Sequence, residues 1–430
     1  MSKQTKKYDE LYSNIELIPD EAIRDTDDSQ GFDVDWDLVE EKYREHHHKH
    51  HHSSGEHSHH SSEKEHSHHS SHSQHSASHN THGRNKKKTG SKKKWSKKKK
   101  ILIGILIFFL CLIIGLVATF LILRHLGKQA MLNYDNLNIS VPDGIKYEDD
   151  GRIIYYNGHT YQFNENIASV LFMGIDNREL KQNAVAGTAG QADALYLFTY
   201  NALNGQIKVL SLNRDTMTDI GRYDASGKYY DTTNTQLCLA YAYGDGQTLS
   251  AENQVTAVER LLYNVPINAY YAINLDAIKI LNDDIGGVTL TPEYTFGSFV
   301  KGQQVTIKGD MAEEFVRHRD TRLLDDNLRR MACQRLYINS FANQIVPSIK
   351  NDLQVPLKLY RHSAEHTVTN IQAPILTYLA SSLATNFSGL NMTTTSGKYV
   401  DVPTDPSAEF KVHKKNLFET VLDFYYTRID

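Results

Sequence analysis

The residues of this sequence best suited to chemistry are carboxylates and arginines near the ends of predicted strands. Asn204-Gly205 is a strong signal for a tight hairpin turn between two apolar runs. Pairing across that turn places Asp193 close to Arg214, and Asp176 ends another apolar run at the same expected sheet edge. Carboxylates of this kind suit Mg²⁺ or Mn²⁺, above all when a phosphate completes the coordination. The alternative is a surface turn in which the aspartates only cap the backbone.

A second group of candidates lies where residues 315–320 read FVRHRD. If this piece is extended, Arg317 and Arg319 point the same way, because side chains alternate along a strand. Two guanidinium groups on one face would clamp a phosphate or pyrophosphate. If the piece is helical, the two arginines diverge by about 200° and are ordinary solvated charges.

A third candidate cation follows in the stretch NLRRMACQRLYINSF. This stretch predicts a helix, and the spacing of four residues puts Arg330 and Gln334 on one of its faces. Arg330 would then contribute to the same anion site. The alternative is an ordinary amphipathic helix.

The elements that position these residues alternate between strand and helix patterns. Such alternation predicts a three-layer α/β/α domain with a mixed central sheet. Residues 168–176 read ASVLFMGID, an apolar run ended by Gly and Asp, as expected for a strand buried on both faces. Strands are further predicted at 194–200, 207–213, 268–274 and 288–291, and helices at 253–263, 275–285 and 417–426.

Residues 101–123 form a run of 23 positions without a charge. At about 1.5 Å per residue a helix of this length spans roughly 34 Å, enough for a hydrocarbon core of about 30 Å. The run is too long and too far from residue 1 for a cleaved signal peptide. The Lys-rich block before it predicts a cytoplasmic N-terminus, with the residues after the helix outside the cell.

The first hundred residues combine an acidic segment, a His/Ser tract and the Lys-rich block. Sixteen of the 22 His fall between residues 46 and 82, and such low-complexity sequence predicts a disordered tail. The tract is either a solvated linker or a tail that binds metal or senses pH. The Lys-rich block is expected to contact anionic membrane lipids. The predicted organisation is a disordered tail (1–100), a transmembrane helix (101–123), an extracellular linker (124–150) and a catalytic domain (151–430).

Composition excludes several other classes of protein. The chain has 47 Lys+Arg and 51 Asp+Glu, a formal net charge of −4, and its one basic cluster is explained by the membrane. We therefore expect no nucleic-acid partner. Three cysteines are too few for a disulfide-built scaffold. Whether Cys238 and Cys333 pair in the oxidising exterior is left open.

Several ordered motifs resemble the LytR-CpsA-Psr family over about residues 168–346. They are LFMGIDNRE, ADALYLFTYNALNGQIKVLSLNRDTMTDI, LAYAYGDG, IGGVTLT, VKGQQVTIKGDMAEEFVRHRD and RRMACQ. The resemblance implies a membrane-anchored transferase of the Gram-positive envelope. It would move a polyprenyl-pyrophosphate-linked glycopolymer, such as teichoic acid or capsular polysaccharide, onto peptidoglycan. The alternatives are a polyprenyl pyrophosphatase and a non-enzymatic, glycolipid-sensing regulator that acts as a transcriptional attenuator.

The resemblance also implies roles for individual residues. Asp193 corresponds to the family's Mg²⁺-linked aspartate, with Asp176 as its partner carboxylate. The sequence departs from the family pattern at Cys333, where an arginine is usual, and at His318, where an aromatic residue is usual. The pyrophosphate-binding cluster would consist of Arg214, Arg317, Arg319, Arg330 and Gln334, with Asp193, Arg214, Arg317 and Arg319 as the catalytic set.

Overall fold

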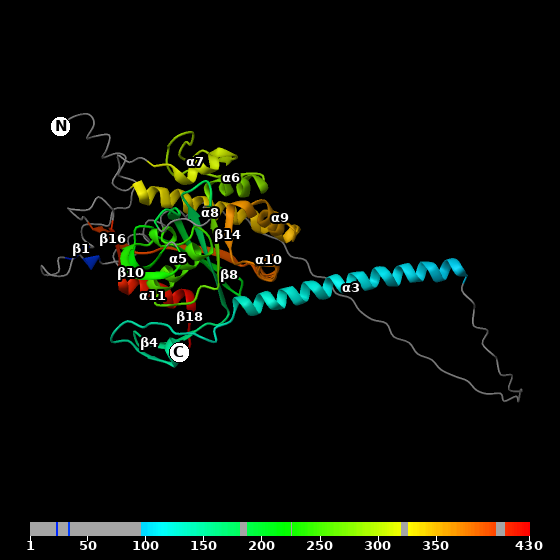
Figure 1. Cartoon of the computed structure of the whole chain (residues 1–430), viewed down its shortest axis with the longest axis horizontal. Helices are drawn as coiled ribbons and strands as arrows, with labels where there is room; N and C mark the ends of the chain where they lie inside the picture. The colour runs from blue at the N-terminus through cyan, green and yellow to red at the C-terminus, as the bar shows by residue number, and fades with distance from the viewer. Residues whose placement is uncertain are drawn as a thin grey trace, which may run out of the picture. The chain divides into compact units, whose positions relative to one another are not determined.

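The computed structural model describes residues 23–24, 33–34, 96–180, 187–224, 226–319, 326–400 and 409–430 (Figure 1). The chain divides into two compact units, residues 1–92 and 93–430. In the first unit, β1 (Ile23–Arg24) pairs with β2 (Asp33–Val34). The rest of the predicted tail up to residue 95 lies outside the described residues. The remaining helices and strands belong to the second unit.

A six-stranded mixed sheet forms the centre of the second unit. Its strand order is β14-β11-β6-β7-β8-β15. Two neighbouring pairs are parallel, β11 with β6 and β15 with β8, and the other neighbours are antiparallel. The mixed sheet predicted from the sequence is therefore confirmed. The bounds are Thr367–Thr369 (β14), Ala269–Ile273 (β11), Ile167–Ile175 (β6), Ala192–Asn201 (β7), Gln206–Leu212 (β8) and Gly389–Thr394 (β15).

Helices cover both faces of this sheet, which gives the three layers. Along β6, Leu171 and Met173 face a core that includes residues of α4, α5 and α11. Phe172 and Gly174 face the other way, toward α6, α8 and α10. This burial on both faces explains why β6 is apolar at every position except Ser169. The helices are Leu239–Ala242 (α4), Thr248–Leu261 (α5), Lys414–Tyr425 (α11), Leu275–Asp284 (α6), Asp326–Asn351 (α8) and Ala373–Asn386 (α10).

The β7–β8 hairpin forms as the Asn204-Gly205 signal predicts. Its register pairs Leu195 with Leu212. Gly205 has φ +74°, a left-handed conformation that favours glycine. A Cβ at this position would also lie 1.2 Å from the carbonyl oxygen of Asn386. The turn therefore requires glycine for both conformation and space, and it fixes the register that aligns the two strand ends.

Helix α3 (Lys97–Met131) contains the predicted membrane span. It is long and apolar enough to cross a membrane, and its apolar window is not buried by the protein. Its last turns pack on α10, where Gly127 and Met131 are buried. The sequence predicted an extracellular linker over 124–150. Residues 124–131 continue the helix, and the apolar side chains that follow are buried in the core, namely Tyr134, Leu137 and Ile139.

Smaller elements surround the central sheet. The predicted strand at 288–291 is β12 (Val288–Leu290), which pairs with β13 (Val305–Ile307) outside that sheet. A four-stranded sheet has the order β18-β5-β4-β3, and two further pairs are β9 with β10 and β16 with β17. Their bounds, with those of the short helices, are Lys146–Glu148 (β3), Ile153–Tyr156 (β4), His159–Phe163 (β5), Met217–Tyr223 (β9), Tyr229–Gln236 (β10), Gly397–Val400 (β16), Glu409–Val412 (β17), Tyr426–Arg428 (β18), Asp149–Gly151 (η2), Asp310–Arg317 (α7), Val355–His362 (α9) and Ala364–His366 (η3).

Candidate functional site

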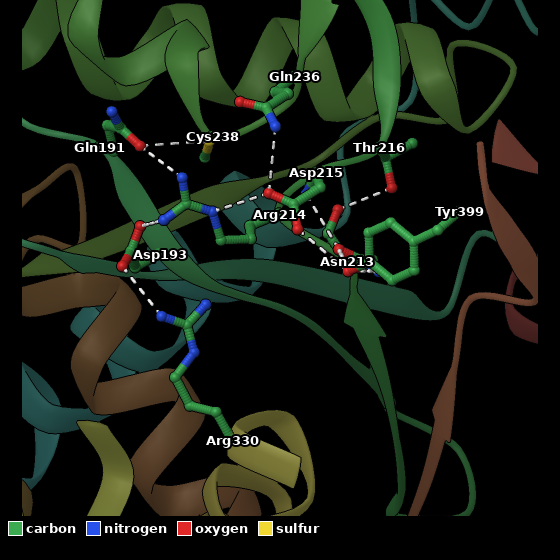
Figure 2. Close-up of polar contacts among 10 residues, drawn as sticks. All are labelled: Gln191, Asp193, Asn213, Arg214, Asp215, Thr216, Gln236, Cys238, Arg330 and Tyr399. Carbon is green, nitrogen blue, oxygen red and sulfur yellow. Dashed lines mark hydrogen bonds and ion pairs between the residues drawn. The ribbon is translucent and has the colours of Figure 1, made fainter. Parts of the chain in front are cut away.

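Two arginines bind one aspartate where β7 begins and β8 ends. Asp193 is the second residue of β7, and Arg214 follows β8 by two residues. The Nη1 atom of Arg214 forms an ion pair with Oδ1 of Asp193, and Nη1 of Arg330 lies 3.3 Å from Oδ2 (Figure 2). The side chains of Arg214 and Arg330 are only 14% and 5% exposed. Because water screens buried charges poorly, the charges of this cluster interact strongly with one another and with an anion that reaches them.

The guanidinium of Arg214 is held on three sides. Besides Asp193, it donates from Nη2 to Oε1 of Gln191 at 2.5 Å and from Nε to Oδ1 of Asp215 at 3.2 Å. Oε1 of Gln191 also accepts a long contact from Sγ of Cys238, at 3.7 Å. These contacts fix the plane of the guanidinium. A fixed plane lets a guanidinium bind phosphate with two parallel hydrogen bonds.

The two outer-domain cysteines are separate thiols. Cys238 and Cys333 are both free and buried, so the disulfide that the sequence left open is absent. Burial raises the pKa of each thiol to about 11. A thiol is nucleophilic only as the thiolate. Cys238 is therefore a neutral neighbour of Arg214 and not a nucleophile.

Asp176 lies near this cluster but serves the backbone. Its Oδ1 accepts a hydrogen bond from the amide N–H of Gln191 at 2.6 Å, and its own N–H donates to the Gln191 carbonyl at 3.0 Å. These bonds span the irregularity in the β6–β7 register that follows Gly174. Asp176 thus holds the strand that carries Asp193.

A bound metal would have to use few protein ligands here. Among the described residues no group of three or more His, Cys, Asp or Glu is arranged to hold a metal ion. Mg²⁺ in phosphate chemistry is commonly held by one or two carboxylates together with substrate phosphates. Asp193 fits that requirement, because its side chain is 26% exposed and its neighbours attract phosphate.

Helix α8 places Arg330 and Gln334 on one buried face, as predicted. Gln334 is 8% exposed. Its Oε1 accepts from the hydroxyl of Tyr196 at 3.2 Å, and its Nε2 donates to the carbonyl oxygen of Val316 at 3.0 Å. Burial raises the pKa of the Tyr196 phenol, which therefore stays protonated. Gln334 thus locks α8 against β7 one turn after Arg330.

The predicted pairing of Arg317 and Arg319 on an extended segment is wrong. Arg317 is the last residue of helix α7, and its Nη1 donates to Oε1 of Glu313 at 2.8 Å. The helix forms because Ala312, Phe315 and Val316 recur at helical spacing and are buried together. Arg319 is exposed and is the last described residue before 320–325. No described contact brings either arginine to Asp193.

A set of polar residues behind Arg214 was missed by the sequence reasoning. Asp215 is 6% exposed and accepts hydrogen bonds from Gln236 and Tyr399 as well as from Arg214. Asp215 stands in the motif NRDT beside Arg214, so its position was a usable signal. No sequence signal pointed to Tyr399, because it lies beyond residue 350 and outside the motifs.

An apolar cavity of about 340 Å³ lies between the central sheet and α8. Its size is in the range of about 300–1,000 Å³ that is usual for small-molecule pockets. Its lining includes Tyr196 and Gln334, which lie on β7 and α8, and Leu383 of α10. Gln334 lies one helical turn after Arg330, so the apolar lining and the arginine cluster share helix α8.

Fold and site together define an α/β protein with a helix long and apolar enough to span a membrane, an apolar cavity and a cluster of ion-paired arginines and aspartates. The model of the LytR_cpsA_psr family matches residues 146–421. The chain therefore belongs to the LytR_cpsA_psr family.

Comparison with known proteins gives relatives with the same fold. The chain is 33% identical over 155 residues to the polyisoprenyl-teichoic acid–peptidoglycan teichoic acid transferase TagU of Bacillus cereus, covering 35% of this chain and 44% of TagU. It is 33% identical over 156 residues to TagU of Halalkalibacterium halodurans, with the same coverage. The crystal structure of protein gbs0355 from Streptococcus agalactiae has a TM-score of 0.50 at 21% identity, covering 61% of this chain and 90% of that one. The matches span less than half the length of these curated relatives.

Proposed function

We propose that this protein transfers a glycopolymer from polyprenyl pyrophosphate onto peptidoglycan. The observation that carries the proposal is that helix α8 contributes both Gln334 to the lining of the apolar cavity and Arg330, one turn earlier, to the ion pairs of Asp193. An isoprenoid diphosphate has the same two halves, an apolar chain and a compact polyanion. The TagU relatives, whose name states a teichoic acid transferase acting on peptidoglycan, support the class of donor and acceptor.

In the proposed reaction a peptidoglycan hydroxyl attacks the phosphorus that carries the glycopolymer. The bond from that phosphorus to the polyprenyl phosphate breaks, and polyprenyl phosphate leaves while the hydroxyl proton passes to a base. Arg214 and Arg330 neutralise charge on the pyrophosphate oxygens as the leaving group departs. No covalent intermediate on the protein is needed.

Asp193 has a second role in this proposal, as the protein ligand of Mg²⁺ or Mn²⁺. The ion would neutralise phosphate charge alongside the arginines. Asp193 contacts both arginines in the absence of substrate. Its carboxylate would therefore have to share those contacts with the phosphates when substrate binds.

Arg317 and Arg319 keep their proposed role in binding pyrophosphate on the family resemblance alone. Arg317 is 48% exposed and held by Glu313, so it would have to exchange this partner for the substrate. A change of rotamer at an exposed helix end is sufficient for such an exchange.

We further infer the membrane orientation. The N-terminus would be cytoplasmic and residues after α3 outside, because Lys97–Lys100 precede the apolar window of the helix. The site would then face the compartment in which peptidoglycan lies.

The test is reconstituted transfer by the full-length protein in detergent, using a polyprenyl-pyrophosphate-linked glycopolymer and peptidoglycan fragments, with and without Mg²⁺. Loss of one charge-stabilising contact commonly lowers the rate about 10²- to 10³-fold, and we expect this for Asp193→Asn and Arg317→Ala. Arg428→Ala is the matched control, because the side chain of this exposed arginine pairs with Asp430 at the C-terminus. Release of polyprenyl phosphate without transfer would show a pyrophosphatase instead. Tight glycolipid binding without either reaction would show a sensor.

A further inference from the structure

The carboxylate of Asp215 supports Arg214 from the side opposite the anion site. Arg214 points its two terminal nitrogens toward Asp193 and Gln191, and its Nε toward Asp215 (Figure 2). Asp215 therefore contacts Nε, the one guanidinium nitrogen that does not contact Asp193 or Gln191. Its position is one of the three that fix the plane of the guanidinium.

Tyr399 holds that carboxylate in place. Its hydroxyl donates to Oδ2 of Asp215 at 3.0 Å, while Oδ1 receives Nε of Arg214 at 3.2 Å. The same hydroxyl accepts from Nδ2 of Asn213 at 3.0 Å. Each carboxylate oxygen thus has a separate partner, and rotation of the group would break both bonds.

Tyr399 reaches this position from a distant part of the chain. It lies on β16, whose partner strand β17 contains Phe410. The Phe410 N–H donates to the backbone carbonyl of Asp215 at 2.9 Å, and its ring packs edge-on against Tyr399 with centroids 5.2 Å apart. The β16–β17 pair is therefore attached to the residue next to Arg214 by both backbone and side chain.

We propose that Tyr399 is a positioning residue, which acts through Asp215 to orient Arg214 toward the pyrophosphate. This inference rests on the proposed transferase function. The hydroxyl of Tyr399 contacts Asp215, and Asp215 in turn contacts Arg214.

The test removes the hydroxyl and leaves the ring. In the full-length protein in detergent, Tyr399→Phe is expected to lower kcat of transfer about tenfold, with KM changed less than about twofold, because a misaligned charge affects the transition state most. The matched control is Tyr156→Phe. Tyr156 also donates to a carboxylate, Glu419 at 2.9 Å, and packs edge-on against a phenylalanine, but outside the site. The kcat of Tyr156→Phe should equal that of the wild type.

A double-mutant cycle separates positioning from a general structural loss. In an Arg214→Ala background, Tyr399→Phe should have no further effect on kcat, because the residue through which it acts is gone. An equal tenfold loss in both backgrounds would overturn the proposal. So would unchanged kcat in the single variant.

A spectroscopic measurement keeps the inference testable if the protein is not a transferase. With ¹⁵N-labelled arginine, the Nε–H signal of Arg214, assigned by its loss in Arg214→Ala, should exchange slowly with water in the wild type. Tyr399→Phe should make that exchange faster and shift the signal, whereas Tyr156→Phe should not. An unaltered Arg214 signal in Tyr399→Phe would refute the positioning role, whatever reaction the site performs.

Discussion

The contact between the membrane helix and the outer domain can be tested at a single atom. Gly127 of α3 packs so closely on α10 that an added Cβ would lie 2.0 Å from the carbonyl oxygen of Pro374 and 2.8 Å from Cβ of Tyr378. Real Cβ contacts essentially never fall below 3.0 Å, so Gly127→Ala forces the backbones apart by 3.0 − 2.0 = 1.0 Å or more. Overpacking of this kind typically costs about 1–3 kcal/mol.

The same helix supplies a matched control. Gly115 has nothing within 4 Å of its added Cβ. Gly127→Ala and Gly115→Ala raise the helix propensity of α3 equally. A difference in hydrogen exchange between the two variants therefore reports the clash at residue 127. Hydrogen exchange of the full-length protein in detergent measures the docking. We expect amides of α10 to exchange roughly 5- to 150-fold faster in Gly127→Ala, the factor that corresponds to about 1–3 kcal/mol. Equal exchange in both variants would mean that this contact does not dock α3 on α10.

Two further outcomes follow from buried titratable groups. Because burial raises the pKa of Cys238 and Cys333 to about 11, only about one thiol in a thousand is ionised at pH 8, and both should react slowly with alkylating agents until the protein is unfolded. Titration of denatured, unreduced protein should find all three thiols of the chain free, and a missing pair would mean a disulfide. Burial also raises the pKa of Glu259, whose Oε1 accepts from the Ile267 N–H. As pH rises, the Glu259 carboxyl loses its proton in the unfolded chain before it does in the folded protein. The free energy of unfolding should therefore fall between the ordinary carboxyl pKa and the raised pKa of the folded protein. Thermal unfolding of Glu259→Gln should lack this pH-dependent loss of stability.

The sequence predicted the parts of the site that depend on local geometry. The glycine turn at Gly205 fixes the hairpin register, and this alone brings Asp193 to Arg214. Helical spacing likewise places Arg330 and Gln334 on one face. Both inferences concern contacts within one hairpin or one helix, where the periodicity of the element determines which way each side chain points.

The failures involve contacts that periodicity does not encode. Arg317 follows Ala312, Phe315 and Val316, which are buried together at helical spacing. Their burial favours a helix over the extended segment that the alternation of the arginines suggested. The segment 124–150 has no regular sequence pattern, yet the ring of Tyr134 is buried in the hydrophobic core. Tyr399 meets Asp215 across 184 residues of chain. Such a contact depends on tertiary packing, which a single sequence does not reveal.

The charge balance of the site decides which substitution of Asp193 tests chemistry. Arg330 is 5% exposed, and removal of one partner of a buried ion pair commonly costs about 3–5 kcal/mol, because the other charge is left uncompensated. Asp193→Ala and Asp193→Asn both remove the charge that faces the arginines, and Asp193→Ala also removes both oxygen acceptors and the volume of the carboxylate. Asp193→Asn keeps an oxygen acceptor and the side-chain volume, and removes the negative charge that a metal requires. If Asp193 acts in catalysis, Asp193→Asn should lose transfer and its dependence on Mg²⁺ while its thermal unfolding stays closer to that of the wild type than that of Asp193→Ala. Full transfer by a folded Asp193→Asn protein would leave Asp193 only the structural role of holding the two arginines.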